Sequence, residues 1–350
     1  MLVDPEAFTI RRWRRGTGFR YVDVDTGRSP GREARARIEA LAIPPAWRAV
    51  RCAREDNAHI LALGEDGGGR RQYVYHPDWT DVREAVKVER VLRFGRALPR
   101  LRERIARDLR GAGGRQKGPG GASRGQLGRR RVSAAAARLI DRAAMRPGNE
   151  GYALTGHRGA TTLARAQAAV AGDRVALDYV GKSGRAHAFT VRDAGVARVV
   201  RGLKRRPART RHRARLFVYR DAHGRVRRLT AAKLNRYLAR AADAPVSAKD
   251  FRTFIGSATA LEALWRRREE GGPHAGDAAR ARAVAAAMRE VAERLRNTPA
   301  VARASYVVPG IVEAFERGTL EERLFSGPRR KGLDRAETAL MRHLEGALSR

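Results

Sequence analysis

Five side chains in this sequence combine types that could act together on a phosphodiester: Arg146, Lys182, Arg252, Asn297 and Tyr306. Attack on phosphorus requires a nucleophile, cations that hold the non-bridging oxygens, and an acid for the leaving oxygen. A tyrosine can be the nucleophile, an arginine fork matches two phosphate oxygens, and a lysine beside other cations gives up its proton readily. These types therefore favour phosphoryl transfer.

Each residue alone also has an ordinary structural interpretation. Lys182 precedes Ser183-Gly184, a predicted hairpin turn in which an exposed lysine is common. Arg146 follows a predicted helix and could cap its C-terminal end. Tyr306 is a weak nucleophile by itself, because roughly one tyrosine in a thousand is ionised at neutral pH; clustered arginines would favour the phenolate.

Two predicted helix starts position three of the candidates. Thr298 as N-cap and Pro299 as first residue predict a short helix that ends at Tyr306. Ser247 has the type of an N-cap, and the turn that follows it places Lys249 and Arg252 on one face. The N-terminus of a helix attracts anions, so this turn is suited to hold a phosphate. A solvated basic face is the alternative.

The hydrophobic pattern predicts an α+β fold, with a small N-terminal antiparallel-sheet domain and a larger, mainly helical catalytic domain that carries a short hairpin or three-stranded sheet. The four expected segments are 1–110, a basic Gly/Arg-rich linker or loop at 111–131, the catalytic domain at 132–318, and a C-terminal helical tail at 319–350. Predicted strands cover 19–24, 48–52, 59–63 and 71–76, and a hairpin pairs 175–180 with 185–191. Predicted helices cover 32–41, 79–109 with a break near Pro99, 134–144, 162–169, 231–242, 248–267, 278–295 and 335–348.

The charge of the chain indicates a polyanionic partner. It carries 74 Lys and Arg against 37 Asp and Glu, a formal net charge of +37, which favours nucleic acid; a basic protein that only coats DNA is one alternative. The single cysteine, Cys52, excludes an internal disulfide and fits a reducing cytosol. No secretion signal or membrane-length apolar run is seen, so we expect a soluble, cytoplasmic protein that does not bind membranes.

The order of several short motifs resembles the catalytic domain of type IB DNA topoisomerases of the bacterial and poxvirus kind. The motifs are Arg146 with 148–152, then 159–163, 181–184, 249–253, and 297–299 with Tyr306. Three N-terminal stretches resemble the smaller domain of the same enzymes: 43–47, 70–77 and 94–99. The resemblance runs from about residue 20 to 317.

The resemblance implies a mechanism and a partner. Tyr306 would attack duplex DNA to form a 3′-phosphotyrosyl link, Arg146 and Arg252 would hold the non-bridging oxygens, and Lys182 would protonate the leaving 5′-oxygen. Religation would need neither ATP nor metal, so no cofactor is expected. We expect a monomer that closes as a clamp around double-stranded DNA and is associated with the nucleoid.

The family's DNA-contacting strand corresponds to the predicted strand at 71–76. Alternation places Gln72, Val74 and His76 on one face and Tyr73 and Tyr75 on the other. A half-buried strand with aromatic packing is the alternative. The residues expected to contact DNA are Gln72, Tyr73, Tyr75, Lys249, Arg70 and Arg71.

The chain departs from the family pattern at two places. Asn297 stands where viral and eukaryotic members carry histidine, although bacterial members often carry asparagine, which donates a hydrogen bond but cannot become cationic. The segment 111–131 is longer and more basic than expected, and either a duplex-gripping loop or a passive tether would explain it. The nearest rival is a tyrosine recombinase, which usually presents histidine where this chain has Lys249.

Overall fold

The computed structural model describes residues 1–111, 127–205, 215–271 and 276–348, which form two compact units, Met1–Val86 and Lys87–Arg350. The helix α2 (Pro77–Arg110) begins in the first unit and continues in the second. The boundary expected at residue 110 differs from this division, because most of α2 packs into the core of the second unit. The α+β fold class is confirmed.

Unit 1 is built on a five-stranded antiparallel sheet with the strand order β2-β1-β3-β4-β5. The strands are β1 (Ile10–Arg15), β2 (Gly18–Asp23), β3 (Arg48–Cys52), β4 (Ile60–Glu65) and β5 (Arg71–Tyr75), and the helix α1 spans Arg32–Ala40. The sequence pattern missed β1, because four of its six residues are arginine and Ile10 is its one buried residue. Two apolar clusters pack against the strands, one around Ile10, Ile38 and Val50 and the other around Phe8, Leu61 and Leu63.

The edge strand β5 shows the alternation expected of it. Val74 packs against the first cluster, whereas Tyr73 packs against the second. The rings of Tyr73 and Tyr75 lie 6.1 Å apart, and Tyr75 keeps 37% of its surface exposed. The strand therefore has one aromatic side with a partly exposed ring.

The helix α2 is continuous, so the predicted break near Pro99 is wrong. Pro99 lacks the N–H that would bond the carbonyl group four residues earlier, which usually kinks or ends a helix. Here the residues on both sides are held by burial, since Leu98, Leu101 and Ile105 are almost fully covered. Tertiary packing outweighs the local cost of the proline.

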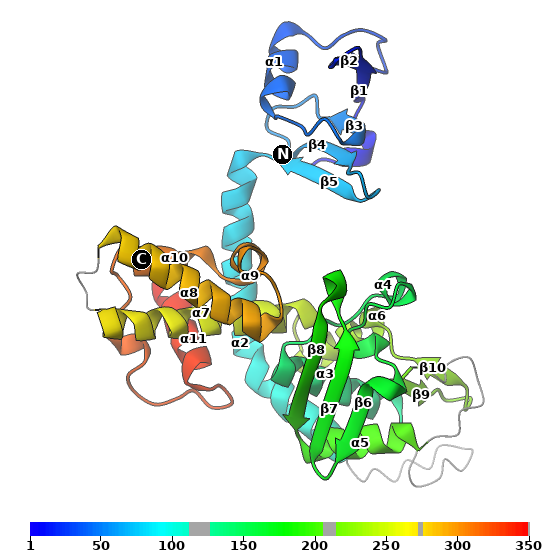
Figure 1. Ribbon diagram of the computed structural model, residues 1–350, viewed down its shortest axis with the longest axis vertical. Coiled ribbons are helices and arrows are strands. Elements are labelled where there is room, and N and C mark those ends of the chain that lie inside the picture. Colours follow the sequence, from blue (N-terminus) through cyan, green and yellow to red (C-terminus); the bar gives the residue numbers. More distant parts are fainter. Residues whose placement is uncertain (112–126, 206–214, 272–275, 349–350) are drawn as a thin grey trace. The chain divides into compact units, whose positions relative to one another are not determined.

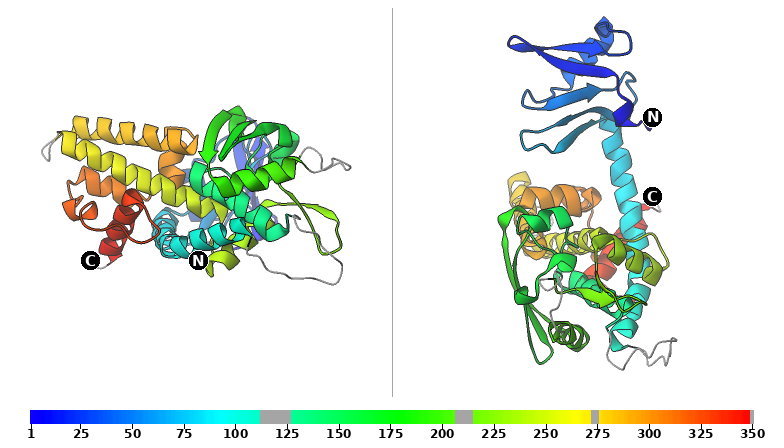
Figure 2. Two further views of the ribbon diagram at one scale, coloured as in Figure 1. Left: turned by 90° about the horizontal axis from the view of Figure 1, so that it is seen from below. Right: turned by 90° about the vertical axis from the view of Figure 1, so that its right-hand side faces the viewer.

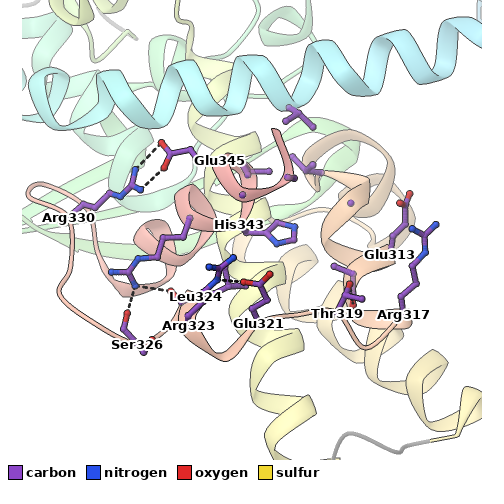
Figure 3. A pocket seen from close by; sticks show the side chains of 18 residues that line it. Glu313, Arg317, Thr319, Glu321, Arg323, Leu324, Ser326, Arg330, His343 and Glu345 are labelled. Carbon is purple, nitrogen blue, oxygen red and sulfur yellow. Dashed lines mark hydrogen bonds and ion pairs between the residues drawn. The ribbon is translucent and has the colours of Figure 1, made fainter. Parts of the chain in front are cut away.

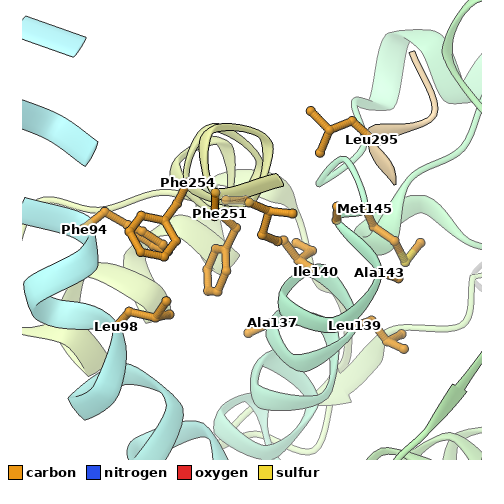
Figure 4. Packing of buried hydrophobic residues seen from close by; sticks show 14 of the residues in the cluster. Phe94, Leu98, Ala137, Leu139, Ile140, Ala143, Met145, Phe251, Phe254 and Leu295 are labelled. Atoms are coloured by element: carbon orange, nitrogen blue, oxygen red, sulfur yellow. The ribbon is translucent and has the colours of Figure 1, made fainter. Parts of the chain in front are cut away.

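Unit 2 is mainly helical (Figure 1), and all of its helices except α4 (Glu150–Leu154) contribute residues to one apolar core. The helices are α3 (Arg129–Ala143), α4, α5 (Ala194–Lys204), α6 (Ala231–Ala242), α7 (Ala248–Gly271), α8 (Asp277–Leu295), α9 (Pro299–Tyr306), α10 (Pro309–Glu316) and α11 (Arg335–Leu348). Figure 2 shows α7 and α8 side by side along most of their length. At the contact between α2 and α7, Phe94 meets Phe251 and Phe254 edge to face, with ring centroids 4.8 and 5.5 Å apart (Figure 4).

A three-stranded antiparallel sheet covers one side of unit 2, in the order β6-β7-β8. It comprises β6 (Ala168–Ala171), β7 (Arg174–Val180) and β8 (Ala186–Arg192), and a separate two-stranded sheet joins β9 (Val218–Arg220) to β10 (Val226–Arg228). The hairpin prediction is confirmed, with Tyr179 opposite His187. The helix predicted at 162–169 is wrong: short 3₁₀ turns lead into β6, because pairing with β7 overrides the helical preference of the alanines.

Two predicted segments flank the expected catalytic domain, the linker at 111–131 and the tail at 319–350. The predicted linker at 111–131 falls mostly on residues outside the described ranges, but Arg129, Arg130 and Arg131 form the first turn of α3. The expected tail at 319–350 is part of unit 2, since α11 packs on α7 and Leu340 lies in the core. Among the described helices, none is both long and apolar enough to cross a membrane.

Candidate active site in unit 2

The short helix α9 presents Tyr306 at its last turn. Thr298 caps the helix by accepting a hydrogen bond from the Val301 N–H at 3.3 Å, as predicted. The C-terminal end is held from α2, where the Lys87 ammonium group donates to the Val307 carbonyl oxygen at 2.5 Å. From α7, the Ser257 hydroxyl group donates to the Tyr306 carbonyl oxygen at 3.2 Å.

A close approach between α7 and α9 depends on Gly256. A Cβ atom at that position would lie 2.8 Å from the Tyr306 carbonyl oxygen and 3.2 Å from the Tyr306 Cβ atom. Both distances are shorter than ordinary van der Waals contact. The absence of a side chain at Gly256 therefore allows Tyr306 to lie directly against the helix that carries Arg252.

Arg252 lies over the ring of Tyr306, with its guanidinium carbon 4.7 Å from the ring centroid. Burial by itself would raise the pKa of Tyr306, but the charges of Arg252, Arg146 and Lys249 outweigh it. The net result is a phenol whose pKa lies below its usual value. The phenolate is thus more accessible here than in an isolated tyrosine.

Arg252 is also held by the ends of two other helices. It is only 3% exposed, and it donates to the Leu295 carbonyl oxygen at 2.9 Å and to the Ala144 carbonyl oxygen. These carbonyl groups lie at the C-terminal ends of α8 and α3. One guanidinium group therefore fixes α3, α7 and α8 around Tyr306.

Asn297 joins Arg146 to the same cluster. Its side chain is 8% exposed, and its Oδ1 atom accepts a hydrogen bond from the Arg146 guanidinium group. Its main-chain carbonyl oxygen accepts from Arg185 Nη1 at 2.8 Å, which ties the β7–β8 hairpin to the junction between α8 and α9. The amide orientation follows from this network, and it points the NH₂ group away from Arg146.

Three buried side-chain nitrogens at the site have no hydrogen-bond partner among the described residues: the donors Arg252 Nε and Asn297 Nδ2, and the ring nitrogen His187 Nδ1. Buried N–H groups are rarely left unpaired, and an unpaired one costs about 1–3 kcal/mol. Arg252 lines a recess of about 10 Å³, room for roughly one oxygen-sized group, together with Lys182 and with Arg146, the hydrogen-bond partner of Asn297. These features fit an anion with oxygen acceptors.

Lys182 stands at the turn between β7 and β8, as the sequence predicted. Its side chain is exposed, and its Nζ atom lies 5.9 Å from the centroid of the Tyr152 ring on α4. It lines the same recess as Arg146 and Arg252. The five candidates from distant parts of the sequence are thus brought together in unit 2.

Several site residues were missed by the sequence analysis. Arg158, Tyr179, His187 and Arg296 also line the recess. The rings of Tyr179 and His187 stack with centroids 4.9 Å apart. Their facing positions could have been found by counting outward from the hairpin turn, whereas no local pattern identifies Arg296.

Burial sets the protonation of the stacked pair. Burial, together with the smaller effect of the charges of Arg296, Arg146, Arg252 and Arg185, lowers the pKa of His187 to about 4. Burial raises the pKa of Tyr179 to about 12, although three arginines oppose the shift. Both side chains are therefore neutral near pH 7.

The candidate DNA-contacting residues of unit 1 lie on or beside β5, and the arginine and glutamine side chains among them contact acidic residues of the same unit. Arg70 forms an ion pair with Asp66 at 2.9 Å, and Gln72 donates to the same carboxylate group at 2.9 Å. Arg71 pairs with Glu6. On unit 2, Lys249 is exposed on the first turn of α7, close enough to Tyr306 to favour its phenolate.

A larger cavity of about 690 Å³ lies elsewhere on unit 2, against α10 and α11 (Figure 3). Two of its four arginines are paired with glutamates, Arg330 with Glu345 at 2.5 Å and Arg323 with Glu321, and Glu313 also lines it. It contains none of the five candidates. In the described part of the chain, no group of three or more His, Cys, Asp or Glu side chains could hold a metal ion.

Comparison with known proteins identifies the class that this fold and site define. The model of the eukaryotic DNA topoisomerase I catalytic core matches residues 77–314, and that of the bacterial DNA topoisomerase IB N-terminal domain matches residues 18–66. The chain therefore belongs to the type IB DNA topoisomerase family and is an isomerase that acts on DNA.

A curated relative supports the same placement. The chain is 27% identical to DNA topoisomerase 1B of Acanthamoeba polyphaga mimivirus over 312 residues, which cover 88% of this chain and 87% of the relative. The match extends across both units. The topoisomerase prediction is thus confirmed in preference to a recombinase or a passive DNA-coating protein.

Proposed function

We propose that Tyr306 cleaves one strand of duplex DNA and that the enzyme relaxes supercoils through this break. The Oη atom of Tyr306 bonds to phosphorus, the bond to the 5′-oxygen breaks, and the phenolic proton passes to water. The product is a 3′-phosphotyrosyl link, whose reversal by the 5′-hydroxyl group reseals the strand. This link keeps the phosphodiester at similar energy, so the proposed cycle uses neither ATP nor a metal ion.

The other candidates have separate proposed roles. Arg146, Arg252 and Asn297 hold the non-bridging oxygens, where charge develops in the transition state. Lys182 gives a proton to the leaving 5′-oxygen and takes it back during religation. The observation that carries this proposal is the pair of buried, unpartnered donors, Arg252 Nε and Asn297 Nδ2, beside a tyrosine whose pKa is lowered.

We further propose that β5 of unit 1 and the first turn of α7 contact the duplex. Tyr75 offers a partly exposed ring, and Gln72, Tyr73, Arg70, Arg71 and Lys249 supply the remaining contacts. DNA phosphates would replace the acidic partners of the two strand arginines. The enzyme would act as a monomer that closes around DNA in the cytoplasm, associated with the nucleoid.

Relaxation of a supercoiled plasmid tests the mechanism. We expect wild-type protein to relax the plasmid in buffer that contains EDTA and no nucleotide, and to leave a protein-linked 3′ end when denatured during the reaction. Tyr306→Phe should bind the plasmid like wild type but form no adduct. Relaxation by Tyr306→Phe, or a strict requirement for ATP or magnesium, would refute the proposal.

A further inference from the structure

A second basic site lies at the other end of α3 from Tyr306. A cavity of about 360 Å³ is lined by six cationic side chains from three helices: Arg104 of α2, Arg129 and Arg130 of α3, and Lys233, Arg236 and Arg240 of α6. We call it the α3–α6 pocket. Ser133 and Ala143 are ten residues apart along α3, which corresponds to about 15 Å of helix, so the pocket is separate from the recess near Arg252.

The pocket holds positive charge that its surroundings do not neutralise. None of the described residues that line it is acidic. Arg104 contacts Asp108 at 3.3 Å, but Arg129, Arg236 and Arg240 have no hydrogen-bond or ion-pair partner in the described ranges. The cavity beside α10 and α11 differs, because three glutamates line it and two of them pair with its arginines. An uncompensated set of cations in a hollow concentrates anions.

The backbone and one buried hydroxyl group add hydrogen-bond donors. α3 spans 15 residues, and its N-cap, Gly128, has no side chain to occupy the first N–H groups of the helix. Ser133 lines the pocket, is 0% exposed, and its Oγ atom has no partner in the described residues. Such a hydroxyl group normally finds a partner, so its state here points to a ligand.

We propose that the α3–α6 pocket binds a small oligophosphate, a compact ligand with several phosphoryl groups. The arginines of α3 and α6 donate to the phosphoryl oxygens, which also accept from the first turn of α3. Tyr237 is the one aromatic residue among those that line the pocket, and its hydroxyl group is held by Asp108 at 2.9 Å. The site therefore recognises the phosphoryl chain rather than a stacked base.

A hollow of this size favours a small ligand over a DNA segment. Pockets for small molecules start near 300 Å³, whereas a duplex presents its phosphates on a convex surface that does not match a concave pocket of this size. The pocket binds independently of cleavage at Tyr306, so the inference does not depend on the proposed mechanism.

Calorimetric titration with sodium tripolyphosphate tests the proposal. The full chain is first saturated with a short duplex, which occupies DNA-binding surfaces, and the salt concentration is matched in every titration. We expect a single saturable site in wild type. Arg236→Ala combined with Arg240→Ala should weaken binding at least about tenfold, because charge-assisted hydrogen bonds are lost.

A matched double variant controls for the high net charge. Arg282 and Arg289 are exposed on α8 and lie outside the pocket, so Arg282→Ala with Arg289→Ala removes the same charge elsewhere. This control should bind tripolyphosphate within about twofold of wild type. Equal losses in both double variants, or no loss in either, would show diffuse binding and overturn the proposal.

Measurements of duplex affinity test whether the α3–α6 pocket contacts DNA instead. The two double variants should have the same affinity for the short duplex, and added duplex should not displace tripolyphosphate. If the duplex competes, or if only the pocket variant loses duplex affinity, the pocket is a DNA contact and the oligophosphate proposal is wrong.

Discussion

Asn297 places a neutral donor at a site whose other donors are cations. Because an amide does not titrate, its proposed contribution to cleavage should be independent of pH. We expect Asn297→Ala to slow covalent adduct formation by about 10²-fold, the usual effect of losing one such donor, in single-turnover assays between about pH 6 and 8. Asn297→His should retain a donor and become less active as the pH rises.

The two substitutions at Asn297 distinguish a catalytic contact from a structural one. A loss of folding in Asn297→Ala would appear in thermal unfolding, and Asn297→His controls for the space that the side chain fills. Adduct formation by Asn297→Ala at the wild-type rate would contradict the role given to this residue.

His187 makes the stability of unit 2 depend on pH in a known direction. Its pKa falls from 6.5 to about 4 because it is buried, and Arg146, Arg185, Arg252 and Arg296 add to the effect. Between these two values the unfolded chain binds a proton at His187 that the folded chain excludes. The part of the free energy of unfolding that depends on neutral His187 is therefore fully present above pH 6.5 and is lost as the pH falls toward 4.

Urea unfolding at about pH 7 and pH 5 measures this contribution. We expect wild type to lose more free energy of unfolding between the two pH values than His187→Gln does, because glutamine cannot take up a proton. Carboxylates titrate in both proteins and cancel in the difference. Equal losses would mean that His187 is accessible to protons in the folded state.

At the scale of elements, the contact between α2, α7 and α11 depends on a glycine in the middle of a long helix. A Cβ atom at Gly95 would overlap the Met341 sulfur atom and lie 2.7 Å from the Phe254 ring. Gly95→Ala should therefore lower the free energy of unfolding by about 1–3 kcal/mol, the usual cost of overpacking. Denaturant titration followed by circular dichroism measures the change.

Gly310 provides the control for this substitution. It lies in the first turn of α10, and an added Cβ atom there would meet nothing within 4 Å. Gly310→Ala should leave stability unchanged or raise it by at most about 1 kcal/mol. If Gly95→Ala were equally neutral, the three helices would not be packed as described.

Elements with strong local signals could be predicted from the sequence, and those set by pairing could not. The residues of α6 and α11 were predicted at both ends because caps and apolar spacing agree there. The alanines of β6 favour a helix in the local sequence, and only pairing with β7 makes this segment a strand. The burial that keeps α2 continuous through Pro99 is likewise absent from local sequence.

At the scale of the whole molecule, the order of the motifs predicted which residues meet at the candidate site. The sequence motifs alone indicate Arg146, Lys182, Arg252, Asn297 and Tyr306. What could not be predicted are the side chains that join these elements, such as Arg185 on the Asn297 carbonyl group and Lys87 on the end of α9. Their partners are main-chain atoms, which leave no pattern in the sequence.

The packing of α11 on α7 has a consequence for synthesis. The ribosome adds α11 roughly 60 residues after it completes α7, which at about 5–20 residues per second takes about 3–12 s. Until then, Met341 and Leu340 are missing from the core that they complete. During each round of translation the nascent unit 2 therefore carries an uncovered apolar surface, and in that interval chaperones and self-association compete with folding.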